Sequence, residues 1–484
     1  MTCFPPASAS REDDDAPAPS FSLETLIETS PLFAGALEDR SPIRRRQNHD
    51  FIREAMTLSA APAASPEQAQ RFYLGSIDYL VGGEPNAPVF YPIEMNGSAV
   101  IGASSLPFFA LNAITDEFTR LGERLSQKSA PLMMIPFSRG GNAKTPIKAL
   151  HERILYAQAV KQGFLNQSCA GRIVTSAELL SEGWKSPETP TVVLGYIHDL
   201  LPLIAAQPDR LDLNQRRLDA MTHDQFCDIL FQQAPASFRN CLSYEPINRI
   251  FQASSDKTLF FDWYNQFISA RPSPFLSGPL WARACDSEES LIQCISEALE
   301  SGRRVVIKPR ASALGRGIEF FLSKTSPQDV TQRVQASIAA CQNIYGPQTT
   351  CFPYGVFEFI DAAVIQPGSV AGHASPFEGH KFELRIFIWR SGQTFYAAPS
   401  IAKIASAAYD AQRPDRFSLL NNIAAAKTSA DESPLQFALP LANAQTLALL
   451  GLPPQSVLDL CQFSTRLLQL MTQEDPITSC RLPL

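Results

Sequence analysis

Apolar side chains recur every three or four positions in four long stretches of the chain. These stretches are residues 106–125, 147–160, 288–300 and 456–471. Such spacing is typical of an amphipathic α-helix that packs one face on a core. The apolar face is broadest in the last stretch, where it contains Val457, Leu460, Leu467, Leu468 and Met471. We therefore predict a helix in each stretch.

Shorter runs of β-forming residues lie between turn signals and predict strands. Residues 71–81 and 89–95 flank the loop GGEPNAP, and residues 382–389 and 395–398 flank a Ser-Gly turn. Two such runs joined by a short loop are typical of a β-hairpin. Further short strands are expected in the segment RRVVIKPR and at residues 320–322 and 355–360. The chain should therefore contain two hairpins and several isolated strands.

Strands and helices alternate in the middle of the chain. Residues 131–137 form an apolar run, and the strand-like residues 172–174 and 191–196 are each followed by a helix-like segment, residues 176–183 and 200–206. Alternation of this kind is typical of βα units that build a parallel sheet. We expect a small parallel sheet here.

Composition narrows the class of protein. The chain has 484 residues, 45% of them hydrophobic, with 41 Lys+Arg against 48 Asp+Glu and a net charge of −7. This length corresponds to two or three domains of about 150 residues. The negative charge provides no field that would attract a phosphate backbone, which argues against nucleic acid as the main partner. The ten cysteines contain no CxxC pair, so we expect reduced thiols and no zinc ribbon or disulfide framework.

Targeting signals are not evident in the sequence. Residues 1–45 are rich in proline and contain an acidic run, which predicts a weakly ordered tail and not a secretory signal. A membrane span needs about 20 consecutive apolar residues. The best candidate, residues 192–206, is interrupted by His198, Asp199 and Pro202. We therefore expect a cytoplasmic protein that does not enter a membrane.

Three polar residues of the first hairpin form a candidate metal site. Asp78 lies on one strand, and Glu94 and Asn96 lie two positions apart on the other. Residues i and i+2 of a strand point to the same face, so these side chains can converge on one cation. Ligands that are all oxygen atoms favour Mg²⁺ over zinc. The alternative is a hairpin whose polar residues simply face water.

A lysine at the end of a buried strand is a candidate phosphate ligand. Lys308 follows three apolar residues and precedes the loop RASALGRG, which includes Ser312, Gly315 and Gly317. A strand that delivers a lysine and then turns through a Ser/Gly loop can place an ammonium and backbone N–H groups around a polyphosphate. A surface lysine before an ordinary turn is the alternative.

Together, the segments VVIKPRASALGRGI and GSIDYLVGGEPNAPVFYPIEMNG resemble the ATP-grasp superfamily of carboxylate–amine ligases. Their order resembles the circularly permuted branch, which includes eukaryotic-type glutathione synthetase and glutathionylspermidine synthase. The segments SSDKTLFFDWY, GVFEFID and KFELRIFIWRSGQTFYAAPSIAKIA are similar to later parts of the same module. The resemblance covers residues 70–112 and 245–430. It implies a mixed α+β and α/β fold, namely a circularly permuted ATP-grasp fold with an inserted small α/β substrate domain.

This resemblance implies four regions, which are a tail at residues 1–45, a metal-binding part at 46–112, a central substrate domain at 113–255 and nucleotide-binding lobes at 256–484. It also implies roles for individual residues. Asp78, Glu94 and Asn96 would hold Mg²⁺, and Arg385 and Lys308 would be catalytic. The residues implied for ATP binding are Lys257, Lys308, Ser312, Gly315, Gly317, Glu358, Phe359, Ile360, Asp361 and Lys403.

The chain departs from the permuted enzymes in the loop after Lys308, which lacks their metal-binding glutamate. The nearest acid, Glu319, comes two residues after Gly317. Weaker candidates are a polar loop at residues 138–146, the pair Asn248 and Arg249, and two asparagines at 421 and 422. The loop lacks the GxxxxGK[ST] spacing of a phosphate-binding loop, so a flexible polar loop is favoured there.

The implied activity is an ATP-dependent ligation of a carboxylate to an amine through an acyl phosphate, with release of ADP and phosphate. A site with two lysines, one arginine and oxygen ligands, but no evident nucleophile, is consistent with such a reaction. A small-molecule kinase and a nucleotide-binding regulator without turnover are the alternatives. The expected substrates are an amino acid, a small peptide or a polyamine, and the sequence does not distinguish among them.

Overall fold

The computed structural model describes most of the chain from Ser41 to Gln473. The segments outside the described residues are 1–40, 71, 85–86, 97–101, 127–131, 136–145, 170–171, 176–190, 194–256, 310–314, 316, 323–324, 346–351, 368–374, 413, 422–436 and 474–484. The helices expected at residues 176–183 and 200–206, and most of the predicted tail, therefore lie outside the described part.

The two predicted hairpins are confirmed, and they form one antiparallel sheet. The first consists of β2 (Leu74–Glu84) and β3 (Ala87–Asn96), and the second of β11 (His380–Ser391) and β12 (Thr394–Ala408). Strand β11 pairs with β2, which joins the hairpins in the order β1-β12-β11-β2-β3. Two short strands, β1 (Ala61–Pro62) and β13 (Ala438–Pro440), both pair with β12. Segments about 300 residues apart in sequence thus lie side by side.

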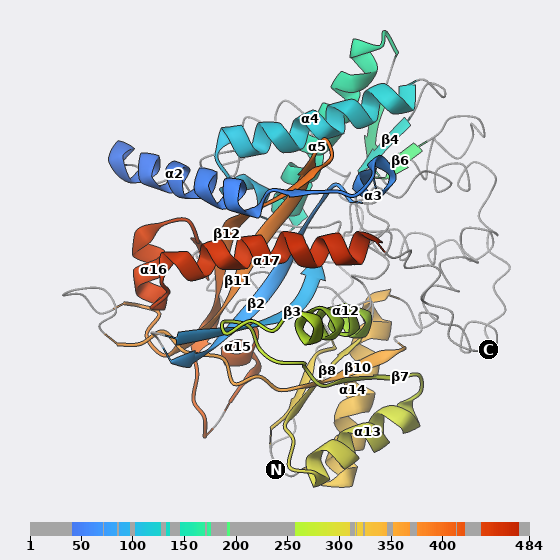
Figure 1. Cartoon of the computed structure of the whole chain (residues 1–484). Coiled ribbons are helices and arrows are strands. Elements are labelled where there is room, and N and C mark those ends of the chain that lie inside the picture. Colours follow the sequence, from blue (N-terminus) through green and yellow to red (C-terminus); the bar gives the residue numbers. More distant parts are fainter. Residues whose placement is uncertain are drawn as a thin grey trace, which may run out of the picture.

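One face of this six-stranded sheet packs on the main apolar core. Side chains at alternate positions point to the same face of a strand. Ile77 and Tyr79 of β2 and Leu384 and Ile386 of β11 all belong to this core. Helix α17 (Pro454–Gln473) lies across the sheet and supplies Leu460, Phe463 and Leu467 to the same core (Figure 1). The predicted apolar face of the last helix is therefore buried as expected.

A second antiparallel sheet stands beside the first. Its order is β7 (Ala282–Cys285), β10 (Tyr354–Glu358), β8 (Val305–Pro309) and β9 (Glu319–Phe321). Helices α13 (Glu288–Glu300) and α14 (Pro327–Tyr345) cover one face and enclose Val305 and Ile307 in a separate core. Val306, which points to the opposite face, belongs to the main core instead. Lys308 has the same parity as Val306, so strand β8 directs it toward the first sheet.

Helix α12 (Lys257–Ala270) connects the two sheets. It contacts β3 of the first sheet and β7 of the second. The ring of Phe261 in this helix lies 4.8 Å from the ring of Phe357 in β10. Aromatic pairs at this separation add to the stability gained from burying their area. The packing therefore fixes Lys257, the first residue of α12, between the sheets.

The predicted parallel sheet is also confirmed. Strands β5 (Arg172–Thr175), β4 (Leu132–Ile135) and β6 (Thr191–Val193) pair in parallel in that order. Helix α5 (Pro146–Asn166) packs on this sheet, and helix α4 (Phe108–Ser126) packs tightly on α5. Their backbones meet at Gly122 and Gly163, where an added Cβ would collide with the backbone of the other helix. Helix α4 covers part of the remaining face of the six-stranded sheet.

Several elements had no clear signal in the sequence. These are α2 (Pro42–Ser59), α3 (Pro66–Gln70), η1 (Ala103–Ser105), α12, α14, α15 (Arg416–Leu419) and α16 (Ala444–Leu450). Helix α2 contains only three buried residues, so the apolar period that would reveal it is weak. Among the described residues, no helix is long and apolar enough to cross a membrane.

Candidate functional site

The candidate site occupies the polar half of one face of the six-stranded sheet. On β11, Phe387 and Trp389 pack in the apolar cluster under α4, whereas Arg385 and Glu383 continue the same face. On β2, Leu74 belongs to that apolar cluster, while Asp78 lies further along the same face. Alternation places these side chains on one surface. The face therefore changes from apolar to charged where α4 no longer covers it.

Asp78 lies at the centre of the charged half, and its side chain is fully buried. Its two carboxylate oxygens accept from Nε and Nη2 of Arg385, at 2.8 and 2.7 Å. Lys403 Nζ donates to the same carboxylate at 2.9 Å. Burial alone would raise the pKa of Asp78, but the adjacent charges of Arg385 and Lys403 hold that pKa well below its usual value. Asp78 is therefore ionised and fixes two cations.

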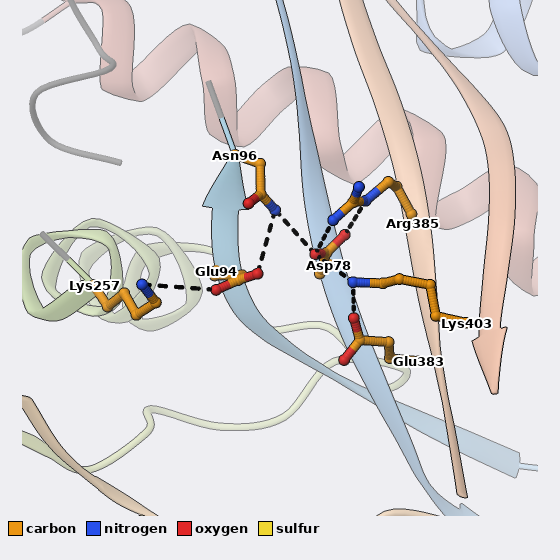
Figure 2. A network of polar contacts seen from close by, with 7 residues as sticks. All are labelled: Asp78, Glu94, Asn96, Lys257, Glu383, Arg385 and Lys403. Carbon is orange, nitrogen blue, oxygen red and sulfur yellow. Dashed lines mark hydrogen bonds and ion pairs between the residues drawn. The ribbon is translucent and has the colours of Figure 1, made fainter. Parts of the chain in front are cut away.

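The same carboxylate orients Asn96. The Asn96 amide nitrogen donates to Asp78 Oδ2 at 2.9 Å and lies 3.4 Å from Glu94 Oε1. Because both neighbours are carboxylates, the nitrogen faces them, and the carbonyl oxygen points away from Asp78 (Figure 2). The Asn96 oxygen is therefore not used in these two hydrogen bonds.

Two lysines from outside the six-stranded sheet interact electrostatically with Glu94, and Lys257 forms an ion pair with it. Lys257 Nζ lies 3.9 Å from Glu94 Oε2, and its side chain is 10% exposed. Lys308 reaches the same region from the second sheet, with Nζ 5.4 Å from the centre of the Phe357 ring. Burial lowers the pKa of Lys308 to about 8, with Glu94 opposing this shift and Lys257 adding to it. Within the described part of the chain, no carboxylate forms an ion pair with Lys308.

The charges of the site are paired within the described residues at one end. Lys403 forms ion pairs with both Asp78 and Glu383, and Arg385 binds Asp78 through two hydrogen bonds. Two carboxylates therefore neutralise two cations in this half. At the other end, Lys257 pairs with Glu94, and Glu94 also acts electrostatically on Lys308. Two lysines therefore accompany the Glu94 carboxylate in this half.

The residues of this end fit a magnesium ion that also contacts phosphate oxygens. Glu94 and Asn96 offer a carboxylate and an amide oxygen, which are suitable ligands for Mg²⁺. The metal role of Asp78 stays a prediction; its Oδ1 accepts from Arg385, and its Oδ2 accepts from Arg385, Lys403 and Asn96. Among the residues that the structure describes, no group of three or more His, Cys, Asp or Glu is arranged to hold a metal. Among the described residues, Glu94 and Asn96 would hold a magnesium ion here.

The residues at 358–361, which the resemblance implied for ATP binding, lie at the other end of β8. Glu358 pairs with Val305, three positions before Lys308, which corresponds to about 10 Å along the strand. The backbone N–H of Glu358 donates to Trp281 O, and that of Phe359 donates to Arg304 O. Those two N–H groups are therefore already paired within the protein.

Charged residues surround the end of β10, where Glu358 and Phe359 lie. Asp361 forms ion pairs with Lys381 at 2.9 Å and Arg304 at 3.4 Å, and the Arg304 guanidinium lies 5.0 Å from the centre of the Phe359 ring. The backbone oxygen of Ile360 accepts from Ala362 N. These contacts make the end of β10 a polar and aromatic patch, separate from the Asp78 network.

The remaining sequence candidates have varied placements. Gly315 and Gly317 both adopt positive φ, at 70° and 69°, which suits glycine. Glu319 is ion-paired with Arg333 of α14 at 2.9 Å. Asn421 is buried, and its side-chain oxygen has no hydrogen-bond partner. The candidates outside the described residues are Ser312, His198, Asp199, Asn248, Arg249, Asn422 and residues 138–145.

Two contributing residues received no site role from the sequence. Glu383 pairs with Lys403, and it could have been found because it lies two positions before Arg385 on the same face. Arg416 donates to the backbone oxygen of Gly315 across 101 residues of sequence, and no local pattern marks it.

Comparison with known proteins gives limited information. No family model and no curated protein matches the sequence. One solved structure with a similar chain is described as a putative gamma-glutamylcysteine synthetase from Methylobacillus flagellatus KT. It is 11% identical in sequence, the match covers 92% of this chain and 98% of that one, and the TM-score is 0.37. A likeness this distant does not identify an activity or a substrate.

These findings correct the family and the fold class expected from the sequence. The expected relatives were ATP-grasp enzymes of the glutathione synthetase type, whereas the structure found similar over most of the chain has a different description. No family model matches the sequence, and this includes the models of the expected superfamily. The short segments behind that resemblance form hairpins and strand–loop units, which are local patterns that unrelated folds share. The described residues form a mixed α+β fold, with two antiparallel sheets and one small parallel sheet.

Proposed function

We propose that this protein is an ATP-dependent ligase that joins a carboxylate to an amine through an acyl phosphate and releases ADP and phosphate. One observation carries the proposal, namely that Lys257 pairs with Glu94 beside Asn96, while strand β8 directs Lys308 toward the same sheet, where Glu94 acts on its charge. Two lysines near carboxylate and amide oxygens are suited to a polyphosphate with its magnesium ion.

In this proposal, Lys257 and Lys308 hold the nucleotide phosphates, while Glu94 and Asn96 hold Mg²⁺. The metal would supply charge neutralisation for the transferring phosphoryl group. Ser312, Gly315 and Gly317 follow Lys308 in the chain and are assigned to the same phosphates. Asp78 is assigned an orienting role, because it fixes Asn96, Arg385 and Lys403 in one network.

Arg385 is assigned to the charge that develops during phosphoryl transfer. Its guanidinium is held by two hydrogen bonds to Asp78, so little reorganisation is needed when a negative group approaches. Lys403 lies beside it on the neighbouring strand. The chemistry requires no protein nucleophile, and positioned cations supply the stabilisation.

The nucleoside is assigned to the patch at the end of β10. Phe359 offers an aromatic surface, and Glu358 and Asp361 offer carboxylates to a ribose. Burial raises the pKa of Glu358, which keeps that carboxyl more readily protonated than an exposed one. We assign the carboxylate and amine to the classes of amino acid, small peptide or polyamine. The structure from Methylobacillus flagellatus is described as a synthetase, a name that fits this class of reaction. The proposal itself rests only on the residues of the site.

The test is release of ADP in the presence of Mg²⁺ and pooled carboxylates and amines, followed by mass spectrometry of the products. The wild-type protein should release ADP and free phosphate and form an amide. Lys308→Ala should bind ATP much more weakly in calorimetry, and Glu94→Gln should lose ADP release. Arg283→Ala is a matched control. Arg283 lies on β7, the edge strand of the second sheet, and forms an exposed ion pair with Glu297 of α13.

The alternatives give different products. A phosphorylated substrate would identify a kinase, and nucleotide binding without turnover would identify a regulator. Either result would refute the ligase assignment. Undiminished ATP binding by Lys308→Ala would refute the phosphate site itself.

A further inference from the structure

The loop that follows Lys308 is attached to two different parts of the molecule. Near its far end, the backbone oxygen of Gly317 accepts from Ser337 Oγ at 2.6 Å. Two residues earlier, the backbone oxygen of Gly315 accepts from Arg416 Nη2 at 2.5 Å. The donors belong to α14 and α15, which lie on different sheets.

The Gly317 attachment is internal to the second sheet and its helices. Ser337 also shares a hydrogen bond with the Tyr354 hydroxyl of β10, at 3.0 Å. A Cβ at residue 317 would lie 2.5 Å from Cys341 Sγ, so glycine is needed for this close approach to α14. This end of the loop is therefore attached to the second sheet and its helices.

The Gly315 attachment reaches the first sheet. Helix α15 packs on β12, the strand that carries Lys403. Its start is fixed by Asp415, whose side chain accepts from Ser418 N at 2.8 Å in a reciprocal capping arrangement. Ser418 itself is buried. Arg416 is thus held on a well-anchored turn, and its exposed side chain extends to the loop of the other sheet.

We infer that Arg416 is a positioning residue that ties the Lys308 loop to the six-stranded sheet. The inference rests on the proposed function, since it assigns the loop to the nucleotide phosphates. Lys308 belongs to the second sheet, whereas Glu94 and Asn96 belong to the first. A phosphate between them is bound well only when the two sheets keep their spacing, and the Arg416–Gly315 hydrogen bond links the loop after Lys308 to the first sheet.

A merely structural role would give a different result from a positioning role. The Arg416 side chain is exposed and donates to a single carbonyl, and surface substitutions of this kind change stability little. Its loss should therefore affect nucleotide binding and the accessibility of the loop, and leave thermal stability unchanged.

The experiment compares Arg416→Ala, Arg416→Lys and the control Arg283→Ala with the wild type. Calorimetry with ATP and Mg²⁺ should show about tenfold weaker binding for Arg416→Ala, which corresponds to one charge-assisted hydrogen bond. Arg416→Lys should recover part of the affinity, because lysine can still donate to Gly315 O. The kcat at saturating ATP should stay close to that of the wild type, and the melting temperature should not change.

Limited trypsin digestion tests the tie without any nucleotide. Trypsin cleaves after Arg316, between the two attached glycines, and cleavage there should be faster in Arg416→Ala than in the wild type. Equal cleavage rates, equal ATP affinity, or a lowered melting temperature that parallels the affinity would each overturn the inference. If the wild type binds no ATP at all, the proposed function fails, and that outcome is distinct from equal binding by the wild type and Arg416→Ala.

Discussion

Replacement of Asp78 by asparagine tests the centre of the charged network. Asparagine keeps the shape of the side chain but removes the charge that both Arg385 and Lys403 contact. Their side chains are only 11% and 8% exposed, so water compensates neither cation well. Removal of one partner from a buried ion pair costs about 3–5 kcal/mol. Lys403 retains Glu383, whereas Arg385 loses its two charge-assisted hydrogen bonds, so we expect the lower end, about 3 kcal/mol.

Urea unfolding at neutral pH measures this loss as a lower midpoint for Asp78→Asn than for the wild type. The control is Asp50→Asn, because Asp50 pairs with Arg53 at 2.9 Å with both side chains more than half exposed. Exposed pairs contribute at most about 1 kcal/mol, so this variant should resemble the wild type. A free energy of unfolding for Asp78→Asn within about 0.5 kcal/mol of the wild type would refute the network as the source of stability.

The effect of Asp78 on stability should depend on pH in one direction. The pKa of an aspartate in the unfolded chain is about 3.9. In the folded protein, burial raises the pKa, but Arg385 and Lys403 outweigh burial and lower it. The stabilisation is therefore fully present above the unfolded pKa and is lost as the pH falls through the folded value. The stability difference between the wild type and Asp78→Asn should be constant from pH 5 to 7 and shrink in strong acid.

Two further predictions concern other parts of the molecule. Gly163→Ala should destabilise the protein by about 1–3 kcal/mol, because the new Cβ would collide with the Thr119 carbonyl oxygen, whereas Gly278→Ala, with no atom within 4 Å, should leave the melting temperature unchanged. Equal melting temperatures for the two variants would contradict the close crossing of α4 and α5. ATP affinity should fall as the pH rises through about 8, where Lys308 loses its charge, and a flat profile would contradict its phosphate role.

Local structure was largely predictable from the sequence. Both hairpins and the long amphipathic helices follow from residue periodicity, although β12 continues to Ala408 and α5 to Asn166, well past the expected ends at 398 and 160. The shared face of Glu94 and Asn96 also follows from the two-residue period of a strand. Helix α2 was missed because it has few buried positions, and its stability comes from packing on α17 and β12. Few buried positions do not explain α12, which was missed although seven of its residues are buried.

Long-range contacts were not predictable in the same way. Asp78 and Arg385 are 307 residues apart, and only the pairing of β2 with β11 brings them together. Without that pairing, Asp78 looks like a third oxygen ligand next to Glu94 and Asn96. With it, the carboxylate is occupied by cations. A strand pattern indicates which face a side chain points to, but not which strand will be its neighbour.

The division of one sheet face into an apolar and a charged half explains why the candidate site lies where it does. Covered by α4, the apolar half packs tightly and fixes the register of β2 and β11. A shift of one residue would turn Phe387 and Trp389 to the other face, so the packing strongly disfavours it. The same register sets Arg385 opposite Asp78. The apolar half therefore holds the charged half in position, and substitutions under α4 should disturb the ion network even though they lie outside it.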